Sequence, residues 1–176
     1  MIVRDGLEDG LMADVVPAPA TERFEDWYQA TWSPLVRSLT VFCGDGDRAV
    51  ELASETFARA CQVWAGADHP RQPTAWAYTV AFNLARRHGA RRTRELQLLS
   101  AERSMVAAAE ERDLDLWRAV AELSPRAREA VVLRYVADLR EREVAEVMQI
   151  AEGTVAATLN RARAELRTAL EREVTP

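Results

Sequence analysis

The chain has 176 residues and is rich in alanine, leucine, glutamate and arginine, which favours α-helix in one domain or two small ones. It contains no apolar run of the roughly eighteen residues that a membrane span requires, and its N-terminus lacks the apolar core of a signal peptide. We therefore expect a cytoplasmic protein without membrane insertion. The formal net charge is −5, yet residues 71–103 hold seven arginines against two acidic residues, and a nucleic-acid partner needs such local positive charge.

The sequence gives little indication of a metal site, a cofactor or catalytic residues. Cys43 and Cys61 lie eighteen residues apart, without a CxxC motif or a histidine cluster, so a zinc site has nothing to build on. We expect both cysteines to be small apolar side chains in helices, and no cofactor. His69 and His88 are accompanied by no paired carboxylates, nucleophile–base arrangement or phosphate loop, so we expect neither an enzyme nor a small-molecule substrate.

The first half of the chain predicts helices after a flexible leader, residues 1–20. Thr21 is the expected N-cap of a first helix, which runs to Phe42 and can be kinked or restarted at Pro34. A second helix is predicted over residues 47–65. Its expected inward residues are Val50, Ala53, Phe57, Cys61 and Trp64, and its expected outward residues are Glu51, Glu55 and Arg59.

A third helix, predicted over residues 74–92, places aromatic residues directly before a run of arginines. Trp76 and Tyr78 lie two residues apart and so on different faces, which predicts that at least one is exposed, whereas Phe82 is expected in the core. Exposed rings stack on unpaired bases while arginines neutralise phosphates, as a single-stranded nucleic-acid platform requires. The alternative is a core helix with inward aromatic residues and a solvated arginine tail, and the local pattern leaves both open.

The second half predicts a four-helix unit after a linker at residues 94–112, where periodicity is weak. One helix runs from Asp113 to Leu123. Ser124 is then an expected N-cap with Pro125 at the first helical position, and the next helix carries inward residues as far as Tyr135. The prediction is therefore an all-α fold of two small helical domains, one with three helices and one with four, joined by a flexible linker.

Residues 139–163 predict a helix-turn-helix. Val144, Ala145 and Met148 form one apolar stripe, a second stripe starts at Val155 and Leu159, and only a tight turn containing Ile150 fits between them. The outer side of the second helix would meet the major groove of DNA. A plain helical hairpin in a bundle is the alternative. The outward residues are Thr154, Ala156, Ala157, Thr158, Asn160 and Arg161.

The order and spacing of these segments resemble a known family. LSPRAREAVVLRYVADLREREVAEVMQIAEGTVAATLNRARAEL resembles region 4 of the extracytoplasmic-function (ECF, group 4) RNA polymerase sigma factors, which belong to the sigma-70 family. VELASETFARACQVW resembles the polymerase-binding helix of region 2, and PTAWAYTVAFNLARRHGARR resembles its promoter-melting helix. The similarity covers about residues 22–170, nearly the whole chain.

The resemblance implies a sigma factor that binds core RNA polymerase, reads the −35 element of promoter DNA as duplex, and melts and captures the −10 element. It implies a region 2-like domain at residues 21–93, a linker at 94–112 and a region 4-like domain at 113–172. It also implies an anti-sigma factor that covers both domains. The flexible linker makes a compact inhibited state and an extended active state plausible.

The positions that match the family's motifs give the expected site residues. Contacts with the largest polymerase subunit are expected from Glu51, Leu52, Glu55, Thr56 and Phe57. Contacts with the −10 element are expected from Trp76, Tyr78, Asn83, Arg86, Arg87, Arg91 and Arg92, of which Asn83 would help to hold a flipped base. Contacts with the −35 element are expected from Glu152, Gly153, Thr154, Ala157, Thr158 and Arg161.

Three departures from the family pattern concern details of these sites. Gln149 takes the turn position usually filled by glycine, at a cost of up to about 1 kcal/mol if it is left-handed. Ala156 and Thr158 stand where relatives often carry Lys or Arg, which predicts weaker −35 binding, and Arg48 and Val50 replace acidic residues. Two other hypotheses stay open: a free-standing helix-turn-helix regulator, and a sigma-like decoy that only binds proteins.

Overall fold

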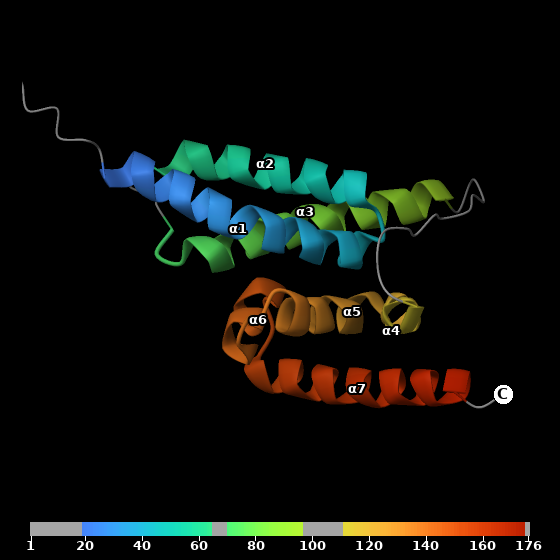
Figure 1. Ribbon diagram of the computed structural model, residues 1–176. Helices are drawn as coiled ribbons and strands as arrows, with labels where there is room; N and C mark the ends of the chain where they lie inside the picture. Colours follow the sequence, from blue (N-terminus) through green and yellow to red (C-terminus); the bar gives the residue numbers. More distant parts are fainter. Residues whose placement is uncertain (1–18, 65–69, 97–110, 175–176) are drawn as a thin grey trace, which may run out of the picture.

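The computed structural model describes residues 19–64, 70–96 and 111–174, and within these ranges the chain is helical, without a strand (Figure 1). The predicted all-α fold of two helical units is confirmed. The first unit consists of α1 (Pro19–Cys43), α2 (Gly46–Trp64) and α3 (Pro73–Leu96). The second consists of α4 (Glu111–Glu122), α5 (Pro125–Val131), the π-helix η1 (Val132–Val136), α6 (Glu141–Met148) and α7 (Glu152–Val174). Residues 1–18 of the predicted leader and 97–110 of the predicted linker lie outside the described residues, and the remaining residues of both segments belong to α1, α3 and α4.

In the first unit, α1 packs on both α2 and α3. An aromatic cluster closes the N-terminal end of α1, where the Trp27 and Trp64 rings stack with centroids 4.6 Å apart. The Trp27 Nε1–H donates to Thr74 Oγ1 at 3.2 Å, which ties the start of α3 to α1. Pro34 lies inside α1 without ending it, so the predicted restart at this residue does not occur.

The buried face of α2 differs from the predicted one at two residues. Val50 is 44% exposed and Cys61 is exposed, although both were expected inward. The buried face instead follows Ala49, Leu52, Ala53 and Thr56 through to Trp64. Val50 follows Ala49 directly, and one residue turns an α-helix by about 100°, so Val50 leaves the face that α1 and α3 cover.

In the second unit, local signals in the sequence form as expected. The Ala127 N–H donates to Ser124 Oγ at 3.3 Å, so Ser124 is the N-cap of α5, with Pro125 in the first turn. α6 and α7 make the predicted helix-turn-helix, and Gln149 in the turn is left-handed with φ 55°. Ile150 packs against the core from this turn, and its N–H donates to the Ala145 carbonyl at 3.0 Å.

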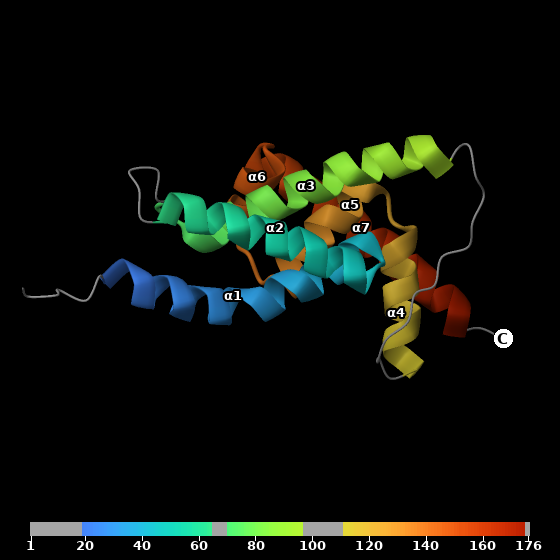
Figure 2. The same ribbon diagram turned by 90° about the horizontal axis from the view of Figure 1, so that it is seen from above.

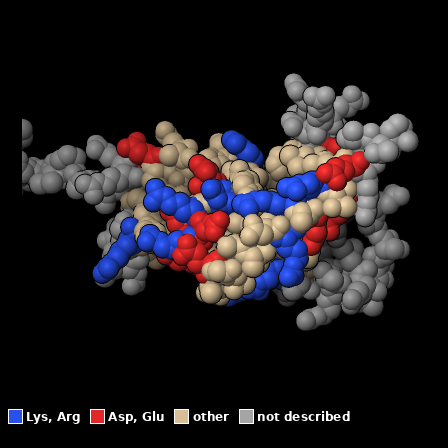
Figure 3. Space-filling model, turned by 90° about the horizontal axis from the view of Figure 1, so that it is seen from below, with Lys and Arg blue, Asp and Glu red and all other residues tan. Residues whose placement is uncertain are grey.

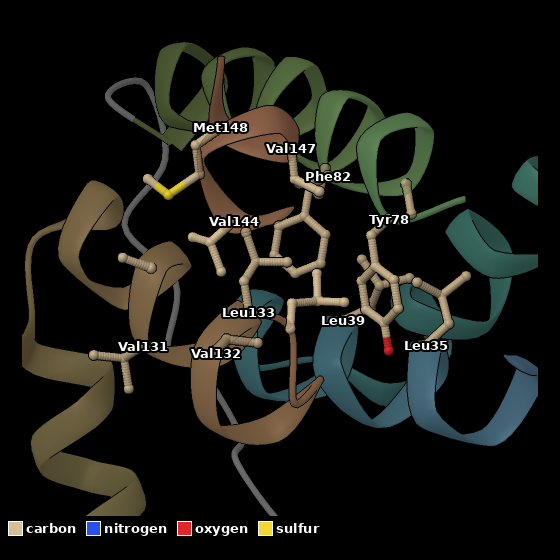
Figure 4. Close-up of a cluster of buried hydrophobic side chains, with 14 of the residues drawn as sticks. Leu35, Leu39, Tyr78, Phe82, Val131, Val132, Leu133, Val144, Val147 and Met148 are labelled. Atoms are coloured by element: carbon tan, nitrogen blue, oxygen red, sulfur yellow. The ribbon is translucent and has the colours of Figure 1, made fainter. Parts of the chain in front are cut away.

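The two units pack against each other and share one hydrophobic core. α3 lies against α6, and α1 lies against η1 and α4. Figure 4 shows Phe82 of α3 among Leu133 of η1 and Val144 and Val147 of α6, and all four side chains are fully buried. Seen from above, α4 runs across the direction of α1, and α7 lies on the far side of α5 and α6 from the first unit (Figures 1 and 2).

The length and polarity of these helices bear on membrane insertion. In the ranges that the structure describes, no helix is both long enough and apolar enough to cross a membrane. The longest, α1, α3 and α7, each interrupt their apolar residues with charged ones.

Candidate nucleic-acid interface

The outer face of α7 brings together the residues predicted to read the −35 element. Val155 and Leu159 are fully buried against the rest of the unit, which turns the opposite side of α7 toward solvent. This side faces away from the first unit (Figure 1). The residues gathered on it are Gly153, Thr154, Ala157 and Arg161, all exposed, with the half-buried Thr158 at its edge. Glu152 is also exposed, but it precedes Val155 and Leu159 by three and seven residues, so it lies above the buried stripe at the N-terminal end of α7.

The charge on this face is mixed. Figure 3 shows arginine side chains spread over it with acidic side chains between them, rather than one continuous basic patch. The Thr158 hydroxyl donates to the Thr154 carbonyl at 2.7 Å, so toward a ligand it can act only as an acceptor. The Gly153 position is open, since a Cβ added there would meet no atom within 4 Å. Among the residues predicted for the −35 element, the face therefore offers small and polar side chains with Arg161 as the one long cation.

α3 carries the residues predicted for the −10 element, but it does not present its aromatic residues as a platform. Tyr78 is buried beside Leu35 and Phe82, and this burial raises the pKa of its phenol (Figure 4). Trp76 is half-buried. The prediction that Tyr78 stacks on a base does not hold in this conformation, because the ring lies in the core between α3 and α1, where no base can reach it. Phe82 lies in the core, as predicted.

Asn83 and Arg86 point toward the second unit. Arg86 Nη2 donates to Asn83 Oδ1 at 2.5 Å, and the same guanidinium forms an ion pair with Glu129 of α5. The Glu129 side chain is only 5% exposed. Burial raises its pKa, and the nearby positive charge of Arg86 lowers it by less. The amide oxygen of Asn83 and the charge of Arg86 are thus both engaged inside the protein.

A cavity of about 410 Å³ opens beside this ion pair, between α3 and the turn of the helix-turn-helix. Asn83, Arg86 and Phe42 line it from the first unit, and Met148 and Gln149 are among its lining residues from the second. Arg87 lies outside it and is exposed. Arg91 and Arg92 lie on the last turns of α3, where side chains are outside the described set.

The predicted polymerase-binding residues divide between the surface and the core of α2. Glu51 and Glu55 are exposed, and each pairs with an arginine of the same helix, Arg48 and Arg59 respectively. Leu52, Thr56 and Phe57 are buried, so they present no surface to a partner in this arrangement, and polymerase contact at these three positions stays a prediction. They fall on the side of α2 that packs on α1 and α3.

The exposed Val50 lies next to Glu51 and is a surface residue that the sequence pattern missed. A stricter fit of the helical period to Ala49, Leu52 and Ala53 would have found it, because Val50 does not belong to that series. Its exposed isopropyl group is an apolar patch beside the Arg48–Glu51 pair on the surface of α2.

Tyr135 is a second exposed residue that the sequence pattern misplaced. It was expected to continue the buried face of the helix that starts at Pro125, yet it is 50% exposed. The reason is η1, in which the Ala137 N–H donates to the Val132 carbonyl, five residues back, at 3.0 Å. This wider turn shifts the register, so Tyr135 emerges beside α7. No signal in the sequence marks a π-helical turn.

Comparisons with known proteins agree with this geometry. The sequence model of Sigma-70 region 2 matches residues 27–95, and that of Sigma-70, region 4 matches residues 113–166. Comparison with curated proteins gives no match.

Two solved structures have the same fold. One is the sigma factor RpoE in complex with the anti-sigma factor NepR from Bartonella quintana, with 22% identity, a TM-score of 0.75, and coverage of 88% of this chain and 99% of that one. The other is CnrH in complex with the cytosolic domain of CnrY, with 20% identity, a TM-score of 0.64, and coverage of 86% and 90%.

Proposed function

The chain belongs to the sigma-70 family and is a promoter-recognition sigma factor, and from this we propose how its two units divide the promoter. It has the two-region organisation that the sequence predicted for the ECF group. We assign polymerase binding and the −10 element to residues 21–93, a linker to 94–112 and the −35 element to 113–172. The protein would act in the cytoplasm as a subunit that catalyses no reaction of its own.

The observation that carries this proposal is the solvent-facing outer side of α7. Thr154, Ala157 and Arg161 lie on it together, and the first unit does not cover it. The N-terminus of α7 adds backbone N–H groups and a partial positive charge that suit a phosphate. Arg161 is long enough to reach a base edge or a phosphate, and the small side chains of Gly153 and Ala157 allow the helix close to DNA.

The −10 element would be bound only after the two units separate. In the closed arrangement Arg86 is paired with Glu129, and its second contact occupies the amide oxygen of Asn83. A flipped base needs a pocket with free hydrogen-bonding groups, and phosphates need unpaired arginines. Separation of α3 from α5 and α6 would break the Arg86–Glu129 ion pair and uncover both Asn83 and Arg86. The exposed Arg87 is accessible in either arrangement.

For the polymerase, we assign direct contact to Glu51 and Glu55, with the exposed Val50 directly before Glu51. Two carboxylates on one helix face suit a basic partner surface. Leu52, Thr56 and Phe57 would contribute indirectly, because their packing against α1 and α3 holds α2 in position. The Thr56 hydroxyl donates to the Leu52 carbonyl at 2.8 Å and the residue is fully buried, so this hydroxyl is not available to a partner.

An anti-sigma factor is a further partner of this proposal. The two structures with the same fold are both named as complexes, one of them explicitly with an anti-sigma factor. The present closed arrangement keeps Asn83 and Arg86 covered, so a protein that bound both units at once would prolong the inactive state. Such a partner would stabilise this state by a free energy that rises with the logarithm of its concentration over Kd, provided that it binds the closed arrangement more tightly than the open one.

Run-off transcription with core RNA polymerase over a library of genomic promoter fragments tests the function directly. Reactions with and without the protein are compared. New transcripts that share one motif near −35 and another near −10 are the expected result. Binding to core polymerase without new transcripts would favour the decoy, and the absence of polymerase binding would favour a free-standing regulator.

A further inference from the structure

The surface beside α7 carries a second arginine-rich site, separate from the predicted reading face. Tyr135 stands half-exposed between Arg134 and Arg163, whose Cζ atoms lie 5.6 and 5.7 Å from its ring centroid. With Asn160 these residues form what we name the Tyr135 cluster. We propose that the Tyr135 cluster binds the phosphate backbone of duplex DNA next to the groove that α7 enters. The proposal rests on the proposed function and adds residues that the family motifs did not assign.

The cluster is held in place before any ligand arrives. Val132 and Leu133 are fully buried, so the π-helical turn that carries Tyr135 is anchored to the core. Arg163 Nε donates to the Tyr135 hydroxyl oxygen at 2.6 Å, and Arg163 Nη1 donates to Asn160 Oδ1 at 2.9 Å. A guanidinium fixed by two hydrogen bonds loses little further freedom on binding, which favours affinity.

The free hydrogen-bonding capacity of the cluster suits an anion. Because the Tyr135 oxygen accepts from Arg163, its own O–H proton is left to donate outward. Arg163 and Arg134 have further N–H donors and can accept nothing. Arg134 forms an ion pair with Asp138, which lies just outside the cluster. Its Nη1 is 3.5 Å from Asp138 Oδ1, and the Asp138 side chain is 96% exposed. Such an exposed pair contributes little and is easily replaced by a phosphate.

The position on α7 favours DNA over an acidic protein surface. Asn160 and Arg163 follow Glu152 by eight and eleven residues, about 12 and 16 Å along the helix axis. Arg163 lies two residues from Arg161 and so on a different side of α7, toward η1. The major groove is about 12 Å wide, so a helix inside it has phosphates along its flanks. A flank cluster can therefore meet the backbone while the outer face meets bases.

The test uses the full chain and a 30-base-pair duplex of mixed sequence, because phosphate contacts need no promoter sequence. Fluorescence anisotropy gives Kd over a range of KCl concentrations for wild type, Arg163→Gln and Tyr135→Phe. Arg118→Gln is the matched control, since Arg118 is an exposed arginine of α4 that also pairs within its helix, with Asp115. Thermal melting of each variant checks that it folds.

We expect Arg163→Gln to weaken duplex binding several-fold and to reduce the slope of log K against log[KCl] by about 0.9, the contribution of one phosphate contact. Tyr135→Phe should weaken binding less, without changing this slope, since it removes a neutral donor. Arg118→Gln should leave both unchanged. The proposal is overturned if Arg163→Gln keeps the wild-type slope, or if wild type fails to bind the duplex at about 20 mM salt, where phosphate attraction is strongest.

An acidic protein partner would give a different pattern. In that case Arg163→Gln would lose affinity for core polymerase while its duplex slope stayed at the wild-type value, and the proposal would be wrong. The duplex experiment and the transcription experiment fail independently. A protein that directs transcription yet shows no effect at Arg163 refutes only the Tyr135 cluster, whereas the reverse pattern refutes only the proposed function.

Discussion

Arg86 of α3 and Glu129 of α5, 43 positions apart in the sequence, form an ion pair across the boundary between the two units. The two partners differ in environment, because the Arg86 side chain is 32% exposed and that of Glu129 only 5%. Burial disfavours the charged form of the carboxylate more than Arg86 favours it, so the pKa of Glu129 lies above its usual value. The pair therefore fixes the geometry of the boundary more than it stabilises the fold.

The first prediction concerns Glu129 and pH. A carboxyl whose pKa is raised in the folded state contributes stability that is fully present below its unfolded pKa of about 4.5 and is lost as pH rises through the folded pKa. Glu129→Gln should remove this contribution and flatten that part of the pH dependence. Urea unfolding of both proteins at pH 4.5 and pH 7.5 measures it. A wild-type minus variant difference that is the same at both pH values would contradict the prediction.

The second prediction separates Arg86 from its neighbour. Arg86→Ala leaves Glu129 buried without its ion-pair partner, which should cost about 1–2 kcal/mol once the partial exposure of Arg86 is taken into account. Arg87→Ala, at the exposed next position, should change the free energy of unfolding by less than about 0.5 kcal/mol. Urea unfolding at pH 7.5 compares the two variants. Equal values for both would show that the ion pair has no role in stability.

The third prediction concerns promoter opening. The double variant Arg86→Ala, Arg87→Ala should reduce strand opening at the −10 element, because two phosphate-neutralising charges are lost. It should bind core polymerase as wild type does, since Glu51 and Glu55 lie on a different helix. Permanganate reactivity of unpaired thymines measures opening, and co-elution with core polymerase measures binding. Wild-type opening by this variant would exclude both arginines from the −10 contact.

The fourth prediction concerns the turn of the helix-turn-helix. Gln149 is left-handed with φ 55°, a conformation that glycine adopts without a steric penalty. Gln149→Gly should therefore stabilise the protein by up to about 1 kcal/mol. Asp138→Gly is the matched control, because Asp138 is also left-handed, with φ 52°. Both variants should raise the urea midpoint, and a lowered midpoint for Gln149→Gly would mean that its side chain makes a compensating contact.

The fifth prediction concerns the cap of α5. Ser124→Ala removes the acceptor for the Ala127 N–H and should cost about 1 kcal/mol, or about 2–4 °C in Tm. Ser54→Ala is the control, because the Ser54 hydroxyl only bonds the Val50 carbonyl inside an exposed part of α2. Alanine is the better helix former there, so Tm should stay or rise. Differential scanning calorimetry distinguishes the two outcomes.

The features that the sequence predicted correctly depend on residues that lie close together along the chain. The Ser124 cap, the helix-turn-helix and the left-handed Gln149 each follow from residues within a few positions of one another. The burial of Tyr78 and the exposure of Val50 were missed, because helical spacing shows that a face is apolar but not where its edges lie. The exposure of Tyr135 depends on a π-helical turn, for which the sequence offers no marker.

The packing of one unit on the other could not be predicted from periodicity. Phe82 was expected in a core, but its partners Leu133 and Val147 lie more than fifty residues away along the chain. The spacing of apolar residues shows which face of a helix is apolar. It does not show which other helix, far away along the chain, packs against that face. The covering of Asn83 and Arg86 by the second unit was therefore visible only in the structure.

The shared core has a consequence for the protein when it is idle. If the two units part in water, Phe82, Leu133 and Val147 become wetted, and apolar surface of this kind promotes aggregation. In the closed arrangement each unit thus keeps the apolar side chains of the other out of water. A partner that separated the two units would therefore have to cover these side chains with its own surface to keep the protein from aggregating.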